Sequence, residues 1–216
     1  MAREHGAVVA VIPALNEAGS IGTVVGGLLT RAAVIVVDDG STDETSSIAR
    51  KAGARVVRHE LNRGYDAALA TGLADASAQG YELVITMDAD GQHNPDLIEP
   101  FIMALRRGAD LVVGVRDYHQ RFSESLFAWI GKRFWGISDP LCGMKGYRLE
   151  RFASAGQFDR YPSVGTSFAI YAARNGLAIS EIAVRTRPRV GTARFGRGLR
   201  ANYIILKALM LGLLNL

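Results

Sequence analysis

The sequence predicts an α/β protein: a Rossmann-like, mostly parallel sheet flanked by helices, in a single domain. Short apolar runs rich in β-branched residues alternate with helical patterns along the first half of the chain. Strands separated by single helices give right-handed crossovers and therefore parallel pairing. With 216 residues, of which 49% are hydrophobic and 21% charged, the chain is long enough for one well-buried core.

The predicted strands are almost wholly apolar, as expected of strands buried on both faces. They cover residues 7–12, 33–37, 54–57, 82–87 and 109–115, and helices are predicted at 19–30, 43–52, 64–79 and 96–107. After residue 116 the pattern predicts a helix over 122–135, a loop entering a short strand in "SDPLCGMKGY", a helix over 163–175 and a strand over 177–187. We expect one domain over residues 1–200, followed by an apolar C-terminal helix over 201–216.

Composition favours a cytoplasmic protein. The single cysteine, Cys142, excludes an internal disulfide and a cysteine-based zinc site, and fits a reducing compartment. The N-terminal apolar run breaks at Pro13 and lacks a small-residue cleavage site, so no signal peptide is expected. Residues 203–216 are apolar apart from Lys207 and Asn215, but the run is shorter than the ~20 residues that span a bilayer.

Charge is distributed unevenly along the chain. Residues 1–108 carry a net charge of −5 and residues 109–216 a net charge of +9, with an arginine-rich, acid-free stretch at 185–200. A basic patch beside an apolar helix provides two signals for binding a membrane surface, so we expect a peripheral protein on the inner face of the membrane. The alternative is a C-terminal helix packed on the sheet. No nucleic-acid recognition motif accompanies the arginines, so nucleic acid is not expected as a partner.

Polar segments follow four of the predicted strands: "PALNE", "DDGSTDE", "HELNRG" and "DADGQH". The carboxyl ends of parallel strands lie at one edge of the sheet, where ligands of such folds bind. Asp38 and Asp39 could accept hydrogen bonds from a base or a ribose, whereas residues 41–44 could instead cap the next helix. Neither G-x-G-x-x-G nor a Walker A motif is present, so a bound diphosphate would need another counterion.

The segment "MDADGQH" offers hard oxygen ligands for such a counterion. If it is extended, alternate residues point to one side, and Asp88, Asp90 and the Gln92 amide converge. Mg²⁺ and Mn²⁺ take one or two carboxylates together with diphosphate oxygens and water. Alternatively the two aspartates only end the strand, while Asn94 and Pro95 start the next helix. Two like charges at close range are unfavourable without a cation, so we favour the metal site.

Four motifs occur in one order: P-x-x-N-E, D-D-x-S-x-D, N-x-G and D-A-D-x-Q. Over residues 7–200 the chain resembles family 2 glycosyltransferases of the GT-A fold, most of all those that transfer mannose or glucose to polyprenol (dolichol) phosphate. The resemblance implies that Pro13, Leu15 and Glu17 grip the donor nucleotide and that Asp39 reads its base or ribose.

In the same way, the resemblance implies a metal held by Asp90 and Gln92, with Asp88 directed towards the donor ribose or sugar. Arg116, after the fifth strand, would meet the donor or acceptor phosphate and act with Asp90 and Asp139 in catalysis. Arg189 would also bind the donor.

The family's D-x-x-S-G-F segment resembles "DPLCGM", which implies acceptor binding at Cys142 and Gly143, together with Arg187 and Arg194. Cys142 replaces the usual serine, and Met144 the usual aromatic residue, which leaves the acceptor preference open. The Q-x-x-R-W signature of polymerising synthases is absent, so transfer of a single sugar is expected.

These implications give one main hypothesis: inverting, metal-dependent transfer of a sugar from a nucleotide diphosphate sugar, of the GDP-mannose or UDP-glucose type, to a polyprenyl phosphate lipid. Transfer to a soluble or cell-envelope glycan hydroxyl is the alternative, and it needs a base, for which Asp139 is a candidate. A lipid phosphate is already anionic and needs none. A non-catalytic nucleotide-sugar-binding domain remains a further alternative, and a phosphatase-like interpretation of "DADGQ" is disfavoured because the motif follows the fourth strand.

Overall fold

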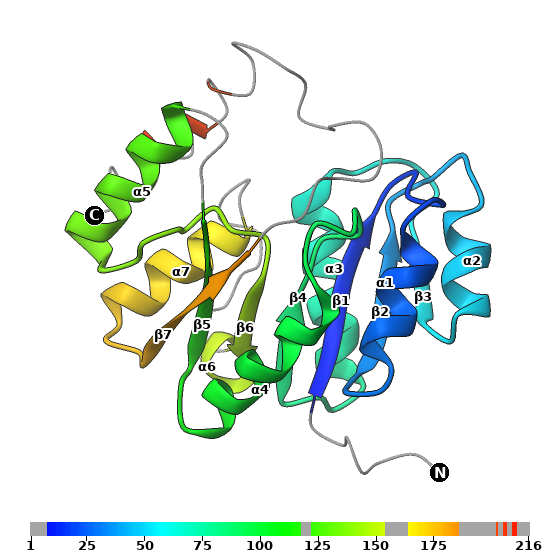
Figure 1. The fold of residues 1–216 in the computed structure, drawn as a ribbon, viewed down its shortest axis with the longest axis horizontal. Helices are drawn as coiled ribbons and strands as arrows, with labels where there is room; N and C mark the ends of the chain where they lie inside the picture. The colour runs from blue at the N-terminus through cyan, green and yellow to red at the C-terminus, as the bar shows by residue number, and fades with distance from the viewer. Residues whose placement is uncertain are drawn as a thin grey trace.

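The computed structural model describes residues 8–117, 122–153 and 164–185 and, near the C-terminus, positions 202, 205, 206, 209 and 210. Within these residues one seven-stranded sheet has the order β3-β2-β1-β4-β6-β5-β7 (Figure 1). The strands are β1 (Val8–Ala14), β2 (Ala33–Asp38), β3 (Arg55–Arg58), β4 (Leu83–Thr86), β5 (Leu111–Arg116), β6 (Lys145–Arg148) and β7 (Ile179–Val184). The predicted α/β architecture is confirmed.

Helices cover both faces of this sheet. On one face the core includes α1 (Ile21–Leu28), α2 (Thr45–Lys51) and α4 (Ile98–Arg106), the last preceded by the short 3-10 helix η1 (Pro95–Leu97). On the other it includes α3 (Tyr65–Ala78), α5 (Phe122–Trp135), α6 (Leu149–Ala153) and α7 (Val164–Arg174). Helix α3 packs closely on β1, because a β-carbon on Gly72 would lie 2.3 Å from the Val11 side chain.

Strand β6 runs against its two neighbours, whereas the other described strand pairs are parallel. Its first residue, Lys145, pairs with Thr86 at the end of β4 and with Val113 in β5. The preceding loop, residues 139–144, therefore lies at the carboxyl ends of the parallel strands. This topology brings "DPLCGM" next to "MDADGQ", although about fifty residues separate them in the chain.

Strand β1 continues through Pro13, which the sequence pattern assigns to the following loop. Met87 donates its N–H to the Val11 carbonyl, and Asp39 donates to the Ala14 carbonyl, so successive β1 residues face β4 and β2 in turn. Pro13 faces the β4 side, where the pairing has already ended at Val11. The missing N–H of proline therefore costs no ladder hydrogen bond.

One further prediction needs correction, and one helix is additional to the predicted elements. Strand β3 is an edge strand whose two arginines, Arg55 and Arg58, are exposed, so it is not buried on both faces. Helix α6 was not predicted. Most other elements lie within two residues of their predicted bounds, and α5 has the predicted bounds.

Near the C-terminus the described positions are helical. Leu209 is buried in the cluster that contains α5 and α7, and Ile205 packs against it, while Leu206 and Met210 are exposed. Asn202 contacts α5 through its side-chain oxygen, 2.5 Å from Ser123 Oγ. The predicted domain boundary at residue 200 lies outside the described residues. Across the described part of the chain, no helix is long and apolar enough to cross a membrane.

Candidate active site

The first two loops at the carboxyl edge of the sheet are joined by side-chain hydrogen bonds. Asn16, with a positive φ of 51°, accepts from the Thr42 N–H at 2.8 Å, and its own N–H donates to Ser41 Oγ at 2.9 Å. The Glu17 N–H donates to Thr45 Oγ1 at 2.8 Å. These bonds fix the P-x-x-N-E loop against the D-D-x-S-x-D loop.

Capping of α2 differs from the prediction. Neither Ser41 nor Thr42 caps the helix, because its N-cap position is Glu44, which makes no side-chain cap hydrogen bond; Asp43, just before it, accepts from the Thr45 N–H at 3.0 Å. The Ser41 N–H donates to Asp38 Oδ1 at 2.8 Å, which leaves Asp38 fully buried inside the turn. Asp38 is therefore a structural residue of this loop.

The three residues predicted to grip the nucleotide occupy different environments. Pro13 is buried within β1 and Leu15 is half-buried in the loop beyond it. Glu17 is buried, and its Oε2 accepts from Ser20 Oγ at 2.9 Å at the start of α1. Among these three, Leu15 is the side chain that a nucleotide at this edge could reach, and their binding roles stay predictions.

Asp39 joins a second loop to the same edge. Its Oδ1 accepts from the Arg63 N–H at 2.9 Å and lies 2.7 Å from His59 Nδ1, and its Oδ2 accepts from the Gly64 N–H at 2.8 Å. His59 Nε2 in turn lies 2.9 Å from Thr71 Oγ1 in α3. Asp39 thus holds the N-x-G loop in place, and a base or ribose would have to share oxygens that are already engaged.

The "DADGQ" segment is a turn, which corrects the expectation of an extended chain. Gly91 has a φ of +74°, and the Gln92 N–H folds back to donate to Asp90 Oδ1 at 3.0 Å. Asp88, Asp90 and Gln92 therefore cannot converge by strand alternation. Asn94 and Pro95 start η1 as predicted, with the Asn94 side chain accepting from the Asp96 N–H.

Asp88 lies where this turn meets the 139–144 loop. Tyr65 Oη donates to its Oδ1 at 3.3 Å, and His93 Nε2 lies 3.6 Å from its Oδ2. Burial opposes ionisation of Asp88, but the contacts from His93 and Tyr65 outweigh it and hold the pKa of Asp88 below its ordinary value. Gly143 packs directly on this carboxylate: an added β-carbon would lie 2.3 Å from Asp88 Oδ2. This contact with Asp88 accounts for glycine at position 143, and the acceptor-binding role of Gly143 stays a prediction.

The oxygen atoms at this turn suit a divalent ion that also binds oxygen atoms of a diphosphate. The described residues contain no cluster of three His, Cys, Asp or Glu side chains that could hold a metal unaided. Asp90 and Gln92 supply one carboxylate and one amide, which is the partial protein shell that Mg²⁺ or Mn²⁺ accepts beside a diphosphate. The chemistry of the donor set thus fits the predicted ion.

Arg116, at the carboxyl end of β5, is held by two carboxylates. Its Nε and NH2 groups donate to the two oxygens of Asp139 at 2.7 and 3.0 Å, and its NH1 donates to Glu124 Oε2 at 3.3 Å. Burial would raise the pKa of Asp139, but the fork of hydrogen bonds from Arg116 holds it below its ordinary value. A carboxylate held in this way is a weak proton acceptor, which argues against the base role considered for Asp139.

Cys142 does not face a ligand site. Its side chain is fully buried, and a β-carbon on Gly114 would lie 2.8 Å from its sulfur. Burial raises the pKa of this thiol to about 11. The Cys142 carbonyl accepts from the buried ammonium group of Lys145. The predicted acceptor contact of the Cys142 side chain is therefore wrong.

The sequence interpretation missed four residues around this centre: Tyr65, His93, Glu124 and Lys145. Lys145 carried a signal, since it is a charged residue directly after the recognised motif "DPLCGM". Glu124 lies in the first turn of α5, where an acidic residue already has a helix-dipole explanation. The predicted Arg187, Arg189 and Arg194 lie outside the described residues.

Comparisons with known proteins show the family of the chain. Residues 9–165 match the family model "Glycosyl transferase family 2". An uncharacterized protein of Methanocaldococcus jannaschii is 34% identical over 82% of this chain and 79% of its own length. The polyprenol monophosphomannose synthase of Mycolicibacterium smegmatis is 29% identical over 81% of this chain and 75% of its own length. The undecaprenyl-phosphate mannosyltransferase of Micrococcus luteus is 26% identical over 92% of this chain and 91% of its own length.

Among solved structures, glucosyl-3-phosphoglycerate synthase from Mycobacterium tuberculosis, in complex with Mn²⁺, uridine diphosphate and glucosyl-3-phosphoglycerate, superposes with a TM-score of 0.74. The match covers 97% of this chain and 79% of that one at 23% identity, and it shows a shared fold. The family model, the relatives and the fold agree, and the protein belongs to glycosyl transferase family 2, as a glycosyltransferase of the GT-A fold.

Proposed function

We propose that this glycosyltransferase moves a single sugar, with inversion, from a nucleotide diphosphate sugar to a polyprenyl phosphate, with Mg²⁺ or Mn²⁺ as cofactor. The donor is of the GDP-mannose or UDP-glucose type. The reaction takes place at the inner face of the membrane, to which the protein binds peripherally from the cytoplasm.

The observation that carries the choice of acceptor is the fork between Arg116 and Asp139. A hydroxyl acceptor must lose a proton as it attacks, and the carboxylate that could take it is already tied to Arg116 at 2.7 Å and has a lowered pKa. A phosphate monoester is ionised near neutral pH and attacks without a base. Two relatives, the polyprenol monophosphomannose synthase and the undecaprenyl-phosphate mannosyltransferase, support the same class of acceptor.

Donor binding is proposed at the turn that carries Asp88 and Asp90. Asp90 and Gln92 would hold the divalent ion, whose positive charge offsets the negative charge developing on the departing diphosphate. The half-exposed Asp88 carboxylate, kept ionised by its neighbours, is available to accept hydrogen bonds from ribose or sugar hydroxyls. The Mn²⁺ and uridine diphosphate in the structure of the mycobacterial synthase support a site of this kind.

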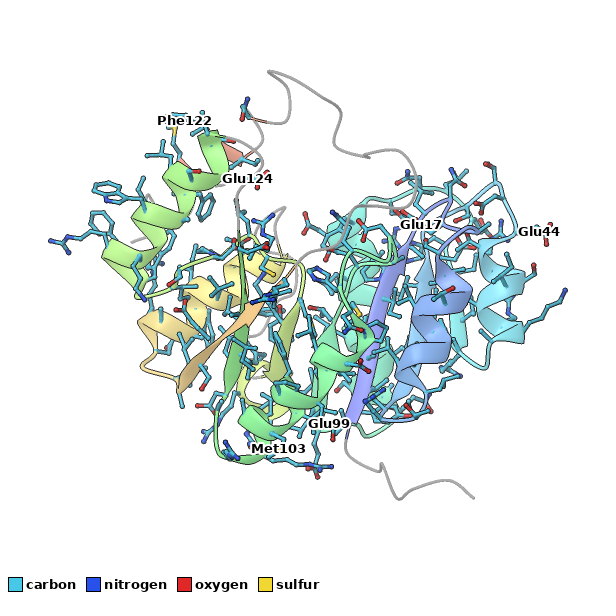
Figure 2. All side chains as sticks on the ribbon, viewed as in Figure 1. Glu17, Glu44, Glu99, Met103, Phe122 and Glu124 are labelled. Carbon is cyan, nitrogen blue, oxygen red and sulfur yellow. The ribbon has the colours of Figure 1, made fainter. Side chains whose placement is uncertain are left out.

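The outer side of α5 supports the membrane location. Phe122, Trp129 and Phe134 are 83%, 66% and 57% exposed on this helix, and Lys132 and Arg133 lie among them. Figure 2 shows Phe122 at the outer end of α5, with Glu124 in the same turn, on the side towards the sheet. Exposed aromatic side chains next to cationic ones suit the interface of an anionic bilayer. The arginine-rich segment 185–200 would add to this attraction.

A thermal-shift screen tests the donor half of the proposal. We expect one of the GDP, UDP, CDP or dTDP sugars to raise the melting temperature only when Mn²⁺ or Mg²⁺ is present, because a ligand that binds the folded state stabilises it by mass action. Asp90→Asn should abolish that shift. A shift that is equally large without a divalent ion would contradict the metal-dependent site.

A further inference from the structure

Glu124 is a buried carboxylate that belongs to none of the sequence motifs. It lies in the first turn of α5, with 5% of its side chain exposed, and its Oε2 accepts from Arg116 NH1 at 3.3 Å. Arg116 itself is 18% exposed at the carboxyl end of β5. Glu124 thus covers one edge of the guanidinium group that is expected to meet a phosphate.

The two carboxylates on Arg116 are not equivalent. Asp139 accepts from three N–H groups of Arg116, the Nε, the NH2 and the backbone N–H, at 2.7, 3.0 and 3.2 Å. Glu124 accepts from one, at the longer distance of 3.3 Å. Bidentate, charge-assisted bonds are the stronger kind, so an incoming anion would displace Glu124 and leave Asp139 in place.

The charges around Arg116 explain why an incoming phosphate would need to replace Glu124. The buried ammonium group of Lys145 interacts electrostatically with Asp139 and with Asp88, so among the described groups two cations face three carboxylates, Asp88, Asp139 and Glu124. These described groups offer no excess positive charge to attract a phosphate. Withdrawal of Glu124 from Arg116 would free one cationic edge for the phosphate.

We propose that Glu124 is a positioning residue that occupies the NH1 edge of Arg116 until the phosphate group of the acceptor replaces it, and that it thereby sets the affinity for the acceptor. The proposal rests on the proposed function, because it assumes a phosphate acceptor. It places the acceptor phosphate between β5 and the first turn of α5, next to the helix whose outer side carries the exposed aromatic residues.

The test is steady-state kinetics of sugar transfer to undecaprenyl phosphate in detergent micelles. Glu124→Gln keeps the size of the side chain but removes the competing charge, so the KM for undecaprenyl phosphate should fall by about 3- to 10-fold while the donor KM stays unchanged. Glu124→Asp withdraws the carboxylate by one methylene and should shift the acceptor KM in the same direction, which provides a second variant if Glu124→Gln does not fold.

The control is Asp75→Asn, which removes a carboxylate from the Arg55 fork at 2.7 and 2.8 Å on β3 and should leave both KM values as they are. If turnover instead drops by roughly two orders of magnitude or more, with no fall in the acceptor KM, Glu124 acts as a base and the proposal is overturned. An unchanged acceptor KM in both variants would also overturn it. If the wild-type protein transfers no sugar to undecaprenyl phosphate, the proposed function fails first, and this proposal fails with it.

Discussion

The carboxylate of Asp88 lies directly on the α-carbon of Gly143, at a spacing that leaves no room for a methyl group between them. Asp88 belongs to the turn after β4, and Gly143 belongs to the loop that enters β6. The antiparallel insertion of β6 between β4 and β5 makes this contact. The proposed donor and acceptor parts of the site therefore meet at this pair of residues.

Gly143→Ala should displace Asp88. The new methyl group would lie 2.3 Å from Asp88 Oδ2, so the carboxylate must move away from the position set by Tyr65 and His93. A shift of about 1 Å in a ligand-binding group lowers kcat/KM by up to ~100-fold, and we expect such a loss for the donor sugar. Gly26→Ala in α1, where nothing lies within 4 Å, is the control and should keep full activity. Full activity in Gly143→Ala would mean that Asp88 does not need its observed position.

Arg116→Met should destabilise the protein in a pH-dependent way. It leaves the Asp139 carboxylate buried without its partner, which we expect to cost about 3 kcal/mol of unfolding free energy at pH 7. Since the pKa of Asp139 is held below its ordinary value of 3.8, the stability that it contributes is complete above pH 3.8 and is lost as the pH falls through the lower, folded value.

Urea unfolding at pH 7 and at pH 3.5 should therefore show a smaller difference between variant and wild type at the lower pH. Arg55→Met, which breaks an ion pair whose arginine is 54% exposed, is the matched control and should cost much less than Arg116→Met, because an exposed ion pair is screened by solvent. A difference for Arg116→Met that does not change with pH would contradict the assignment of the effect to Asp139.

Cys142 should resist alkylation in the folded protein. Its thiol is fully buried, and its pKa is raised to about 11, so at pH 8 it is both inaccessible and protonated. We expect negligible labelling by a maleimide in native buffer and one label per chain in concentrated urea, measured by mass spectrometry. Rapid labelling of the native protein would place Cys142 at an accessible acceptor site, as the motif resemblance implies.

Trp129 should report binding to membranes. The protein has two tryptophans: Trp129 is 66% exposed on the outer side of α5, and Trp135 is 6% exposed in the core. Anionic vesicles should shift the fluorescence emission of the wild type to shorter wavelength and leave Trp129→Phe unchanged. The shift should weaken with salt, because the basic residues contribute to binding. No shift with the wild type would contradict docking through α5.

The alternation of apolar strands and helical patterns was sufficient to predict the parallel part of the sheet, because each element there has its own periodicity. It also predicts a short strand entered from "SDPLCGM", but not where that strand, β6, pairs: "KGYR" has no strand periodicity, and its antiparallel place in the middle of the sheet depends on contacts with β4 and β5. Pro13 breaks the apolar run and is therefore predicted to follow the strand, whereas proline is acceptable inside β1 because the pairing with β4 has already ended at Val11.

At the site, the motifs located Asp88, Asp90, Arg116 and Asp139 at one edge of the sheet, since local sequence fixes which residues follow a strand. They did not reveal which side chains pair with one another. The Arg116 fork and the Glu124 contact join residues 8 to 23 positions apart, and spacing alone does not distinguish a free carboxylate from a paired one.

The most direct test of the proposed reaction is mass-spectrometric detection of sugar transfer, with Mn²⁺ and the donor found by thermal shift, to undecaprenyl phosphate and to undecaprenol in parallel. We expect glycosylated undecaprenyl phosphate, no product from undecaprenol, and a loss of at least ~100-fold in Asp90→Asn, because the ion contributes several kcal/mol to transition-state stabilisation. Asn94→Ala, which removes only the cap of η1, should remain active. Sugar transfer to a glycan hydroxyl, with none to undecaprenyl phosphate, would contradict the proposed function.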